Sequence, residues 1–259
     1  MSGIGVFDSG VGGLTVLKTL TQAYPDVNFY FIGDNQRAPY GSRSIEQLKL
    51  FSKELITALV DMDVDLIVTA CNTISSLDLK SLEKEAGVPI IGIIEATAQL
   101  AHTETSNHQI GLIATEKTIE SQCYQRLLKE LDENNELTAL ATPQLVPLVE
   151  ENKMGTEEAL ERVKEALAPI KGEAFDTLIL GCTHYPFLKD EIKQVLGNQI
   201  SIVDASMAVS DPIKKYIRPD MQVSDRTIKL FTSGDPLQFE KIATGLLAPL
   251  DFEIKKINL

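Results

Sequence analysis

The chain has 259 residues, of which 44% are hydrophobic and 24% charged, and its formal net charge is −13 at pH 7. These values are typical of a folded globular protein and exclude a disordered one. The acidic balance argues against nucleic acid as a partner, because binding to phosphates requires clustered Lys and Arg. We find no membrane-spanning run and no signal peptide, so we expect no membrane partner and a cytoplasmic location with reduced thiols.

Short apolar runs with the character of buried strands alternate with segments of helical periodicity along the chain. The predicted strands are 4–8, 29–33, 66–70, 90–94, 110–114, 137–141, 177–180, 200–204 and 228–232. The predicted helices are 14–24, 45–62, 77–86, 119–131, 157–167, 189–196 and 239–247. This alternation predicts an α/β fold with mainly parallel sheets, in which ligands bind at the carboxyl ends of the strands.

Two short stretches, 66–73 and 178–184, resemble one another, and each places a cysteine directly after a strand. A second pair of similar stretches, 4–9 and 110–115, comes earlier in each half. Gly5 precedes Cys71 by 66 residues, and Gly111 precedes Cys182 by 71 residues. The order and the spacing of these landmarks therefore agree across the two halves. The agreement favours a duplicated architecture over the general similarity of strand-turn-helix units.

Such a duplication predicts two similar α/β domains related by a pseudo-two-fold axis, with the active site in the cleft between them. We expect the first domain to span 1–94 and to be completed by 208–259, and the second to span 95–207. At the C-terminal end, Asp235 is expected to cap a helix that has Pro236 in its first turn.

The repeated cysteines are Cys71 and Cys182. A thiol at a helix start gains acidity from the helix dipole and the N–H groups there, which favour the thiolate. Two such thiols could remove a proton from one face of a carbon and supply one to the other, which is the chemistry of racemisation. His184 lies two residues after Cys182 and could hold or relay its proton. Cys123 lies within a helical pattern and is interpreted as a core residue.

The glycine-rich turn at 8–13 (Asp-Ser-Gly-Val-Gly-Gly) permits a close approach of the backbone to a ligand. A nicotinamide site is disfavoured, since position 15, where a third glycine would fall, is Thr15. The loops 33–41 and 142–150 are candidate ligand loops. No metal site is expected, because the three His and three Cys are dispersed.

Taken together, the motifs at 8–13, 39–41 (Pro-Tyr-Gly), 70–73 (Ala-Cys-Asn-Thr), 181–186 (Gly-Cys-Thr-His-Tyr-Pro) and 232–235 (Thr-Ser-Gly-Asp) strongly resemble those of the glutamate racemases. The cysteine motifs are shared with the wider aspartate/glutamate racemase superfamily. The resemblance covers nearly the whole chain. It implies a two-base isomerase that needs no cofactor, takes glutamate as its small-molecule substrate and makes D-glutamate for peptidoglycan. We also expect a homodimer.

Residue by residue, the resemblance implies that Cys71 and Cys182 are the catalytic thiols, assisted by Asp8 and His184. The positions that it assigns to substrate binding are Asp8, Ser9, Pro39, Tyr40, Gly41, Asn72, Thr73, Thr115, Thr118, Glu150, Thr183 and His184. Two departures are mild: Ile74 stands where a small residue is usual, and Glu95 is acidic where some members have no acidic residue.

Three other hypotheses remain open at this stage. The substrate could be aspartate or another acidic amino acid, because pocket depth sets the preferred side-chain length. A binding protein for acidic amino acids would have a similar fold and similar donors but no need of two thiols. A redox protein would join Cys71 and Cys182 in a disulfide, although no Cys-x-x-Cys motif supports it.

Overall fold

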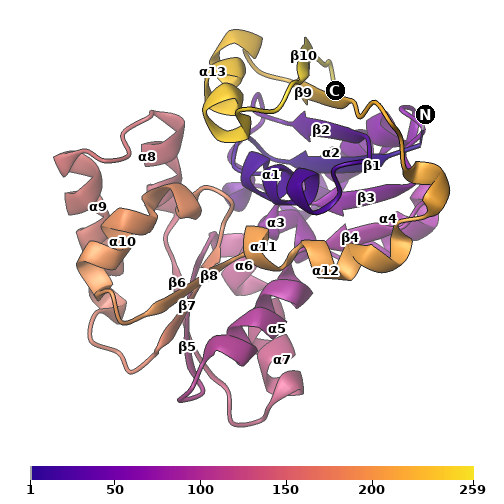
Figure 1. Ribbon diagram of the computed structural model, residues 1–259. Helices are drawn as coiled ribbons and strands as arrows, with labels where there is room; N and C mark the ends of the chain where they lie inside the picture. Colours follow the sequence, from indigo (N-terminus) through magenta and orange to yellow (C-terminus); the bar gives the residue numbers. More distant parts are fainter. Residues whose placement is uncertain (1) are drawn as a thin grey trace. The chain divides into compact units, whose positions relative to one another are not determined.

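The computed structural model describes residues 2–259, which form two compact units (Figure 1). Unit 1 comprises the residues up to Ile93 together with Val209–Leu259, and unit 2 comprises Ile94–Ala208. Each unit contains one sheet, and every strand pair within these sheets is parallel. The α/β class with parallel sheets, predicted from the alternation of apolar runs and helical segments, is therefore confirmed.

The sheet of unit 1 has the strand order β10-β9-β2-β1-β3-β4. Its strands are β1 (Ile4–Asp8), β2 (Phe29–Gly33), β3 (Leu66–Thr69), β4 (Ile90–Gly92), β9 (Ile228–Thr232) and β10 (Glu253–Lys256). All residues of β1, β2 and β3 are buried. Continuous apolar strands of this kind are expected where helices cover both faces of a parallel sheet.

The helices of unit 1 are α1 (Leu14–Ala23), α2 (Ile45–Val60), α3 (Asn72–Ser75), α4 (Leu79–Ala86), α12 (Ser210–Ile213) and α13 (Pro236–Leu247). Helices α2 and α4 pack on the sheet face that carries Phe7, Ile32 and Ile67. Helix α13 covers the opposite face, where Phe239 stacks on Phe31 at 6.1 Å between ring centroids. Asp235 caps α13 and Pro236 is its first residue, as the sequence predicts.

The sheet of unit 2 has the strand order β6-β5-β7-β8. Its strands are β5 (Gln109–Ala114), β6 (Glu136–Ala141), β7 (Thr177–Gly181) and β8 (Ser201–Asp204). Its helices are α5 (Ile94–Glu104), α6 (Glu116–Glu120), α7 (Cys123–Leu131), α8 (Val146–Glu150), α9 (Glu157–Leu167), α10 (Lys189–Leu196) and α11 (Ala205–Ala208).

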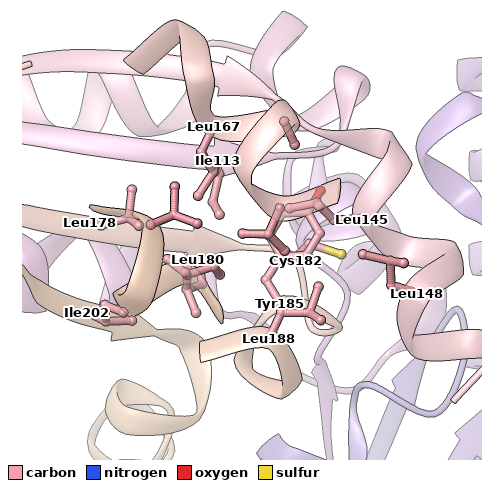
Figure 2. Packing of buried hydrophobic residues seen from close by; sticks show 14 of the residues in the cluster. Ile113, Leu145, Leu148, Leu167, Leu178, Leu180, Cys182, Tyr185, Leu188 and Ile202 are labelled. Carbon is pink, nitrogen blue, oxygen red and sulfur yellow. The ribbon is translucent and has the colours of Figure 1, made fainter. Parts of the chain in front are cut away.

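Alternate residues of β7 enter two different cores, one on each face of the sheet. Leu178 and Leu180 pack in the cluster that contains residues of α8, α9 and α10, and Figure 2 shows Cys182 in the same cluster. Ile179 points to the other face and packs with residues of α5 and α7. This period of two places the carboxyl end of β7 between two packed layers.

The two sheets repeat one topology. The order β2-β1-β3-β4 in unit 1 matches the order β6-β5-β7-β8 in unit 2, so β3 corresponds to β7. Cys71 follows β3 and Cys182 follows β7. The sequence repeat therefore reflects a repeated strand order, which β9 and β10 extend only in unit 1.

Several element boundaries differ from those predicted. The strand predicted over 90–94 ends at Gly92, and Ile94 instead begins α5, a helix that was not predicted. The helix predicted over 119–131 is two helices, because Gln122 has a positive φ of 54° that interrupts it. Part of the loop predicted over 142–150 is helical, as a 3-10 turn (Pro143–Leu145) followed by α8.

Strand β10 was also missed. Its sequence, Glu-Ile-Lys-Lys, lacks an apolar run because it lies at the edge of its sheet and is mostly exposed. Charged residues are common on such edges because they oppose pairing with other chains. Within residues 2–259, no helix combines the length and the apolar character needed to cross a membrane.

Candidate active site

In unit 1 the candidate residues gather where three neighbouring strands end. Asp8 is the last residue of β1, where it pairs with Gly33 of β2, and Cys71 comes two residues after β3. Parallel strands in register end at the same edge of a sheet. Asp8, Ser9, Cys71, Asn72 and Thr73 therefore lie at one edge, and all five are buried.

The Asp8 carboxylate organises the glycine-rich turn that follows it. Its Oδ2 accepts hydrogen bonds from the backbone N–H groups of Gly13 at 2.8 Å and Gly10 at 3.4 Å. Gly13 is required here, because a Cβ at this position would lie 2.5 Å from the Cβ of Asp8. The turn thus holds Ser9 beside Cys71, with 3.9 Å between Oγ and Sγ.

Cys71 is the N-cap residue of α3, as predicted, but α3 has only four residues. Cys182 does not lie at a helix start: a turn separates it from the 3-10 helix Tyr185–Leu188, whose N-cap is His184. The prediction of a helix start is therefore confirmed for Cys71 and wrong for Cys182. Neither thiol faces the end of a long helix, so side chains have the larger part in setting its chemistry.

In unit 2 the thiol belongs to a row of three side chains. Cys182 Sγ lies 3.8 Å from Nδ1 of His184, and Nε2 of His184 lies 2.5 Å from Oε1 of Glu150 at the end of α8. Both Cys182 and His184 are buried, and Glu150 is partly exposed. The imidazole is thus oriented by the carboxylate on one side and contacts sulfur on the other, an arrangement that can store or deliver a proton.

The electrostatics of this row favour a protonated imidazole. Burial alone would lower the pKa of His184, but its interactions with Cys182 and Glu150 outweigh burial and raise that pKa well above its usual value. A positive imidazolium beside sulfur stabilises the thiolate form of a cysteine. Unit 2 therefore places a group that can carry a proton 3.8 Å from the sulfur of Cys182.

The other candidates of unit 2 lie at the ends of the neighbouring strands. Thr115 follows β5, and its side chain caps α6, with 3.0 Å between its Oγ1 and that of Thr118. Thr183 directly follows Cys182 and is buried. These threonines share the carboxyl edge of the sheet with Cys182, because Ala114 pairs with Gly181 in the β5–β7 register.

The turn that carries Pro39, Tyr40 and Gly41 belongs to unit 1. It is a 3-10 turn, Tyr40–Ser42, and the Tyr40 side chain packs in the same core cluster as Cys71. Burial, followed by the nearby Asp34, raises the pKa of Tyr40 far above its usual value, so the hydroxyl is a neutral donor. It donates to the Asp34 carboxylate.

Sequence reasoning missed Asp34, Thr142 and Tyr185 as members of the site. Asp34 and Thr142 lie within the candidate ligand loops 33–41 and 142–150, and Tyr185 lies within the motif at 181–186, but none of them was singled out as a site residue. Each of Asp34 and Thr142 directly follows a strand that neighbours the first strand of its sheet, and that position was the available indication. Tyr185 donates from its hydroxyl to the backbone oxygen of Thr142 at 2.8 Å.

The three cysteines are in the reduced thiol form. Within residues 2–259, no group of three or more His, Cys, Asp or Glu side chains is arranged to hold a metal ion. The thiol, imidazole and carboxylate of Cys182, His184 and Glu150 are groups that can carry out acid–base chemistry.

The chain is similar to known racemases over nearly its full length. The family model for Asp/Glu/hydantoin racemases matches residues 4–209. A glutamate racemase of Lysinibacillus sphaericus is 35% identical over 260 residues, covering 99% of this chain and 98% of the relative.

Two solved structures match with similar completeness. The crystal structure of a glutamate racemase isoform from Bacillus anthracis is 35% identical, with a TM-score of 0.92, covering 100% of this chain and 98% of the other. A glutamate racemase from Francisella tularensis, solved in complex with D-glutamate, is 28% identical with a TM-score of 0.88, covering 99% and 97%. The chain therefore belongs to the Asp/Glu/hydantoin racemase family, within its glutamate racemase group.

Proposed function

We propose that this protein interconverts L- and D-glutamate by proton transfer at Cα, using two thiols and no cofactor. Glutamate is favoured as the substrate because the full-length relatives are glutamate racemases and one of the similar structures holds D-glutamate. The observation that carries the proposal is the matched placement of Cys71 and Cys182, which follow the equivalent strands β3 and β7.

The reaction requires one thiolate and one thiol at a time. The thiolate takes the Cα proton from one face, and the thiol gives its proton to the other face, so the two sulfurs exchange states with each turnover. A simple binding protein has no use for this pair. A carbanion without an electron sink also demands exclusion of water, and burial of both sulfurs is consistent with that demand.

The two thiols are proposed to have different assistants. His184 and Glu150 stabilise the thiolate of Cys182, since the imidazole lies between carboxylate and sulfur. Asp8 and Ser9 assist Cys71, with Asp8 holding the turn that places the Ser9 hydroxyl 3.9 Å from the sulfur.

The remaining candidates are proposed to bind the substrate through side-chain hydroxyl and amide groups and through backbone donors. The N–H and O–H donors suit the two carboxylates of glutamate, and the hydroxyl and amide oxygens can accept from its ammonium group. The residues are Ser9, Pro39, Tyr40, Gly41, Asn72, Thr73, Thr115, Thr118 and Thr183. Thr118 lies in α6, Pro39 is the N-cap of the turn at Tyr40–Ser42, and the others lie in that turn or shortly after the end of a strand.

We further propose that the product serves as the D-glutamate of peptidoglycan, that the enzyme acts in the cytoplasm, and that it is a homodimer. The family to which the chain belongs supports these assignments. We propose two domains with the boundaries expected from the sequence, 1–94 with 208–259 and 95–207.

The test is direct assay of enantiomers by chiral chromatography after incubation with L- or D-glutamate, and in parallel with L- or D-aspartate. We expect both glutamate enantiomers to approach a 1:1 mixture and aspartate to be turned over at least about tenfold more slowly, a margin that a pocket mismatch of one methylene can provide. Faster turnover of aspartate would make the protein an aspartate racemase. Binding of glutamate without conversion would leave only a binding protein.

A further inference from the structure

We propose that Asp34 is a positioning residue, whose buried carboxylate fixes the turn Tyr40–Ser42 beside Cys71 so that the turn can receive the substrate. This inference rests on the proposed function and extends it to a residue outside the candidate catalytic set. We call the side chains of Asp34, Arg37, Tyr40 and Ser233 the Asp34 cluster.

The Asp34 carboxylate receives donors from three directions. Oδ2 accepts from the Tyr40 hydroxyl and from Nε of Arg37 at 2.5 Å, and Oδ1 accepts from the Ser233 hydroxyl at 2.7 Å. The side chain is completely buried. A buried carboxylate is tolerated only where its charge and its lone pairs are satisfied, so these contacts fix the three partners relative to one another.

The backbone of Asp34 joins the cluster to the glycine-rich turn. Its N–H donates to the carbonyl oxygen of Asp8 at 3.0 Å, directly beyond the last pair of the β1–β2 register. Asp34 therefore contacts both the glycine-rich turn, through Asp8, and the Tyr40–Ser42 turn, through Tyr40. A change in its position would move the Tyr40 turn relative to Asp8 and Ser9.

Arg37 balances the charge and anchors the cluster to α2. The guanidinium bonds to Glu54 of α2 as well as to Asp34, and it lies 4.2 Å above the centroid of the Phe51 ring. The Tyr40 ring also packs against Phe51, with 5.4 Å between centroids. The turn is thus held on one side by a helix and on the other by the Asp34 carboxylate.

Ser233 connects the cluster to the C-terminal part of the chain. It follows β9, and its Oγ accepts from the backbone N–H of Gln36 at 3.0 Å while donating to Asp34. Next to it, the Thr232 hydroxyl donates to Asn35 Oδ1 at 3.0 Å. The segment between β2 and the Tyr40 turn is therefore tied down by residues almost 200 positions away.

Unit 2 shows that a buried tyrosine can be anchored at the same place without a carboxylate. Thr142 follows β6 as Asp34 follows β2, and its N–H donates to Ala114 at 2.9 Å. The hydroxyl of Tyr185 is satisfied by the backbone oxygen of Thr142. A hydrogen bond to a buried tyrosine therefore does not by itself require a charged acceptor. We ascribe the Asp34 carboxylate of unit 1 to a second task, which is to hold Arg37, Tyr40 and Ser233 at once.

The experiment compares Asp34→Asn and Tyr40→Phe with Asp65→Asn, by kinetics with both enantiomers and by thermal unfolding. Asp65 is a matched control: it accepts from the Gly3 N–H at 2.9 Å and pairs with Arg218, but it precedes β3 and so lies at the opposite edge of the sheet. Tyr40→Phe removes one oxygen and keeps the ring, so it tests the same contact if Asp34→Asn fails to fold.

We expect Asp34→Asn and Tyr40→Phe each to raise KM for L- and D-glutamate about tenfold or more, while kcat falls less than about threefold. Asp65→Asn should lower the unfolding temperature with KM unchanged. The double variant should show no larger KM effect than the worse single variant, because Asp34 acts on the turn through its contact with Tyr40.

KM values within twofold of wild type in both variants, with wild-type turnover of glutamate intact, would overturn the inference alone and leave the proposed function standing. Additive KM effects in the double variant would also overturn it, since Tyr40 and Asp34 would then act separately. Wild-type protein that does not convert glutamate would instead overturn the proposed function, and this inference with it.

Discussion

Unit 1 and unit 2 each place a thiol at the same point of the same topology, but different side chains surround it in each unit. In unit 1 a carboxylate on the first strand, Asp8, organises the turn beside Cys71. In unit 2 the equivalent strand ends in Ala114, and the carboxylate comes from α8, where Glu150 reaches Cys182 through His184. A repeated fold therefore supplies two similar positions, and the residues around each position decide which proton transfer it suits.

The comparison extends to the opposite edge of each sheet. Asp65 precedes β3 and Asp176 precedes β7, and each carboxylate accepts a backbone N–H from a neighbouring segment of its own unit. These pairs show that the repeat also includes structural features distant from the thiols. Differences between the units near the thiols are then best explained by chemistry, since the surrounding framework is shared.

The largest expected effect is loss of either thiol. Cys71→Ala and Cys182→Ala should each lower kcat/KM for racemisation on the order of 10³-fold or more, because each removes a group that transfers a proton in the transition state. The enantiomers have equal free energies, so kcat/KM must fall equally in both directions. Cys123→Ala, in α7, should remain within twofold of wild type. Near wild-type activity in either thiol variant would contradict the view that each unit supplies one thiol for proton transfer.

A smaller effect should follow from removing the carboxylate of the unit 2 row. Glu150→Gln should lower kcat about 10- to 100-fold at pH 8, since a neutral amide stabilises the imidazolium of His184 less well. The alkaline limb of the kcat/KM profile should move to lower pH. Glu151→Gln is the control, because Glu151 contacts Lys153 instead of His184. An equal loss of kcat in both variants would show that Glu150 has no specific part in proton transfer.

The same group gives a stability test. The pKa of folded His184 lies above its unfolded value of about 6.5. Its stabilising contribution is therefore fully present below that pH and is lost as pH rises through the folded pKa. We expect the unfolding temperature of the wild type to fall over this window and that of Glu150→Gln to fall less. Parallel curves for the two proteins would contradict this assignment.

The glycine turn distinguishes unit 1. Gly13→Ala should destabilise the protein by about 1–3 kcal/mol and lower activity, because the new Cβ would lie 2.5 Å from the Asp8 Cβ and 3.0 Å from the Phe31 ring. Gly245→Ala, in α13, has no atom within 4 Å and should stabilise by up to about 1 kcal/mol. The measurements are chemical denaturation and kcat. A Gly13→Ala variant with wild-type stability and kcat would show that the turn can shift to accommodate the added Cβ.

The smallest effect should come from Asp176 in unit 2. Burial would raise its pKa, but hydrogen bonds from Thr105, Ser106 and Thr177 lower it to about 2. Its contribution is present above the unfolded pKa of about 3.9 and is lost as pH falls through about 2. Because the group is partly exposed, Asp176→Asn should cost only about 1 kcal/mol at pH 7. KM for glutamate should not change, and an altered KM would connect this edge to the site.

Much of the architecture follows from the sequence because buried parallel strands are continuous apolar runs. The bounds of β1, β2 and β9 were predicted as the structure has them. Strand β10 was missed because an edge strand needs no apolar run, and α5 was missed because its first residue continues the apolar run of β4. Local patterns report burial well and report the ends of elements poorly.

The candidate site shows a similar limit. The contact between Glu150 and His184 joins residues 34 positions apart, and the one between Ser233 and Asp34 joins residues 199 apart. No local periodicity contains such contacts, and only the folded chain displays them. The resemblance to the glutamate racemases selected Glu150, whereas Asp34 lay in a candidate ligand loop and was singled out only by its hydrogen bonds.

The central claim is that Cys71 and Cys182 act as two separate bases on one carbon, and deuterium incorporation tests it most directly. Wild-type protein would be incubated with L-glutamate in D2O, and the Cα isotope of each enantiomer followed by mass spectrometry at low conversion. The account predicts D-glutamate that carries deuterium at Cα while the remaining L-glutamate retains protium, because the incoming proton comes from the second, solvent-exchanged thiol. D-glutamate that retains the original protium would indicate a single base and would contradict the account.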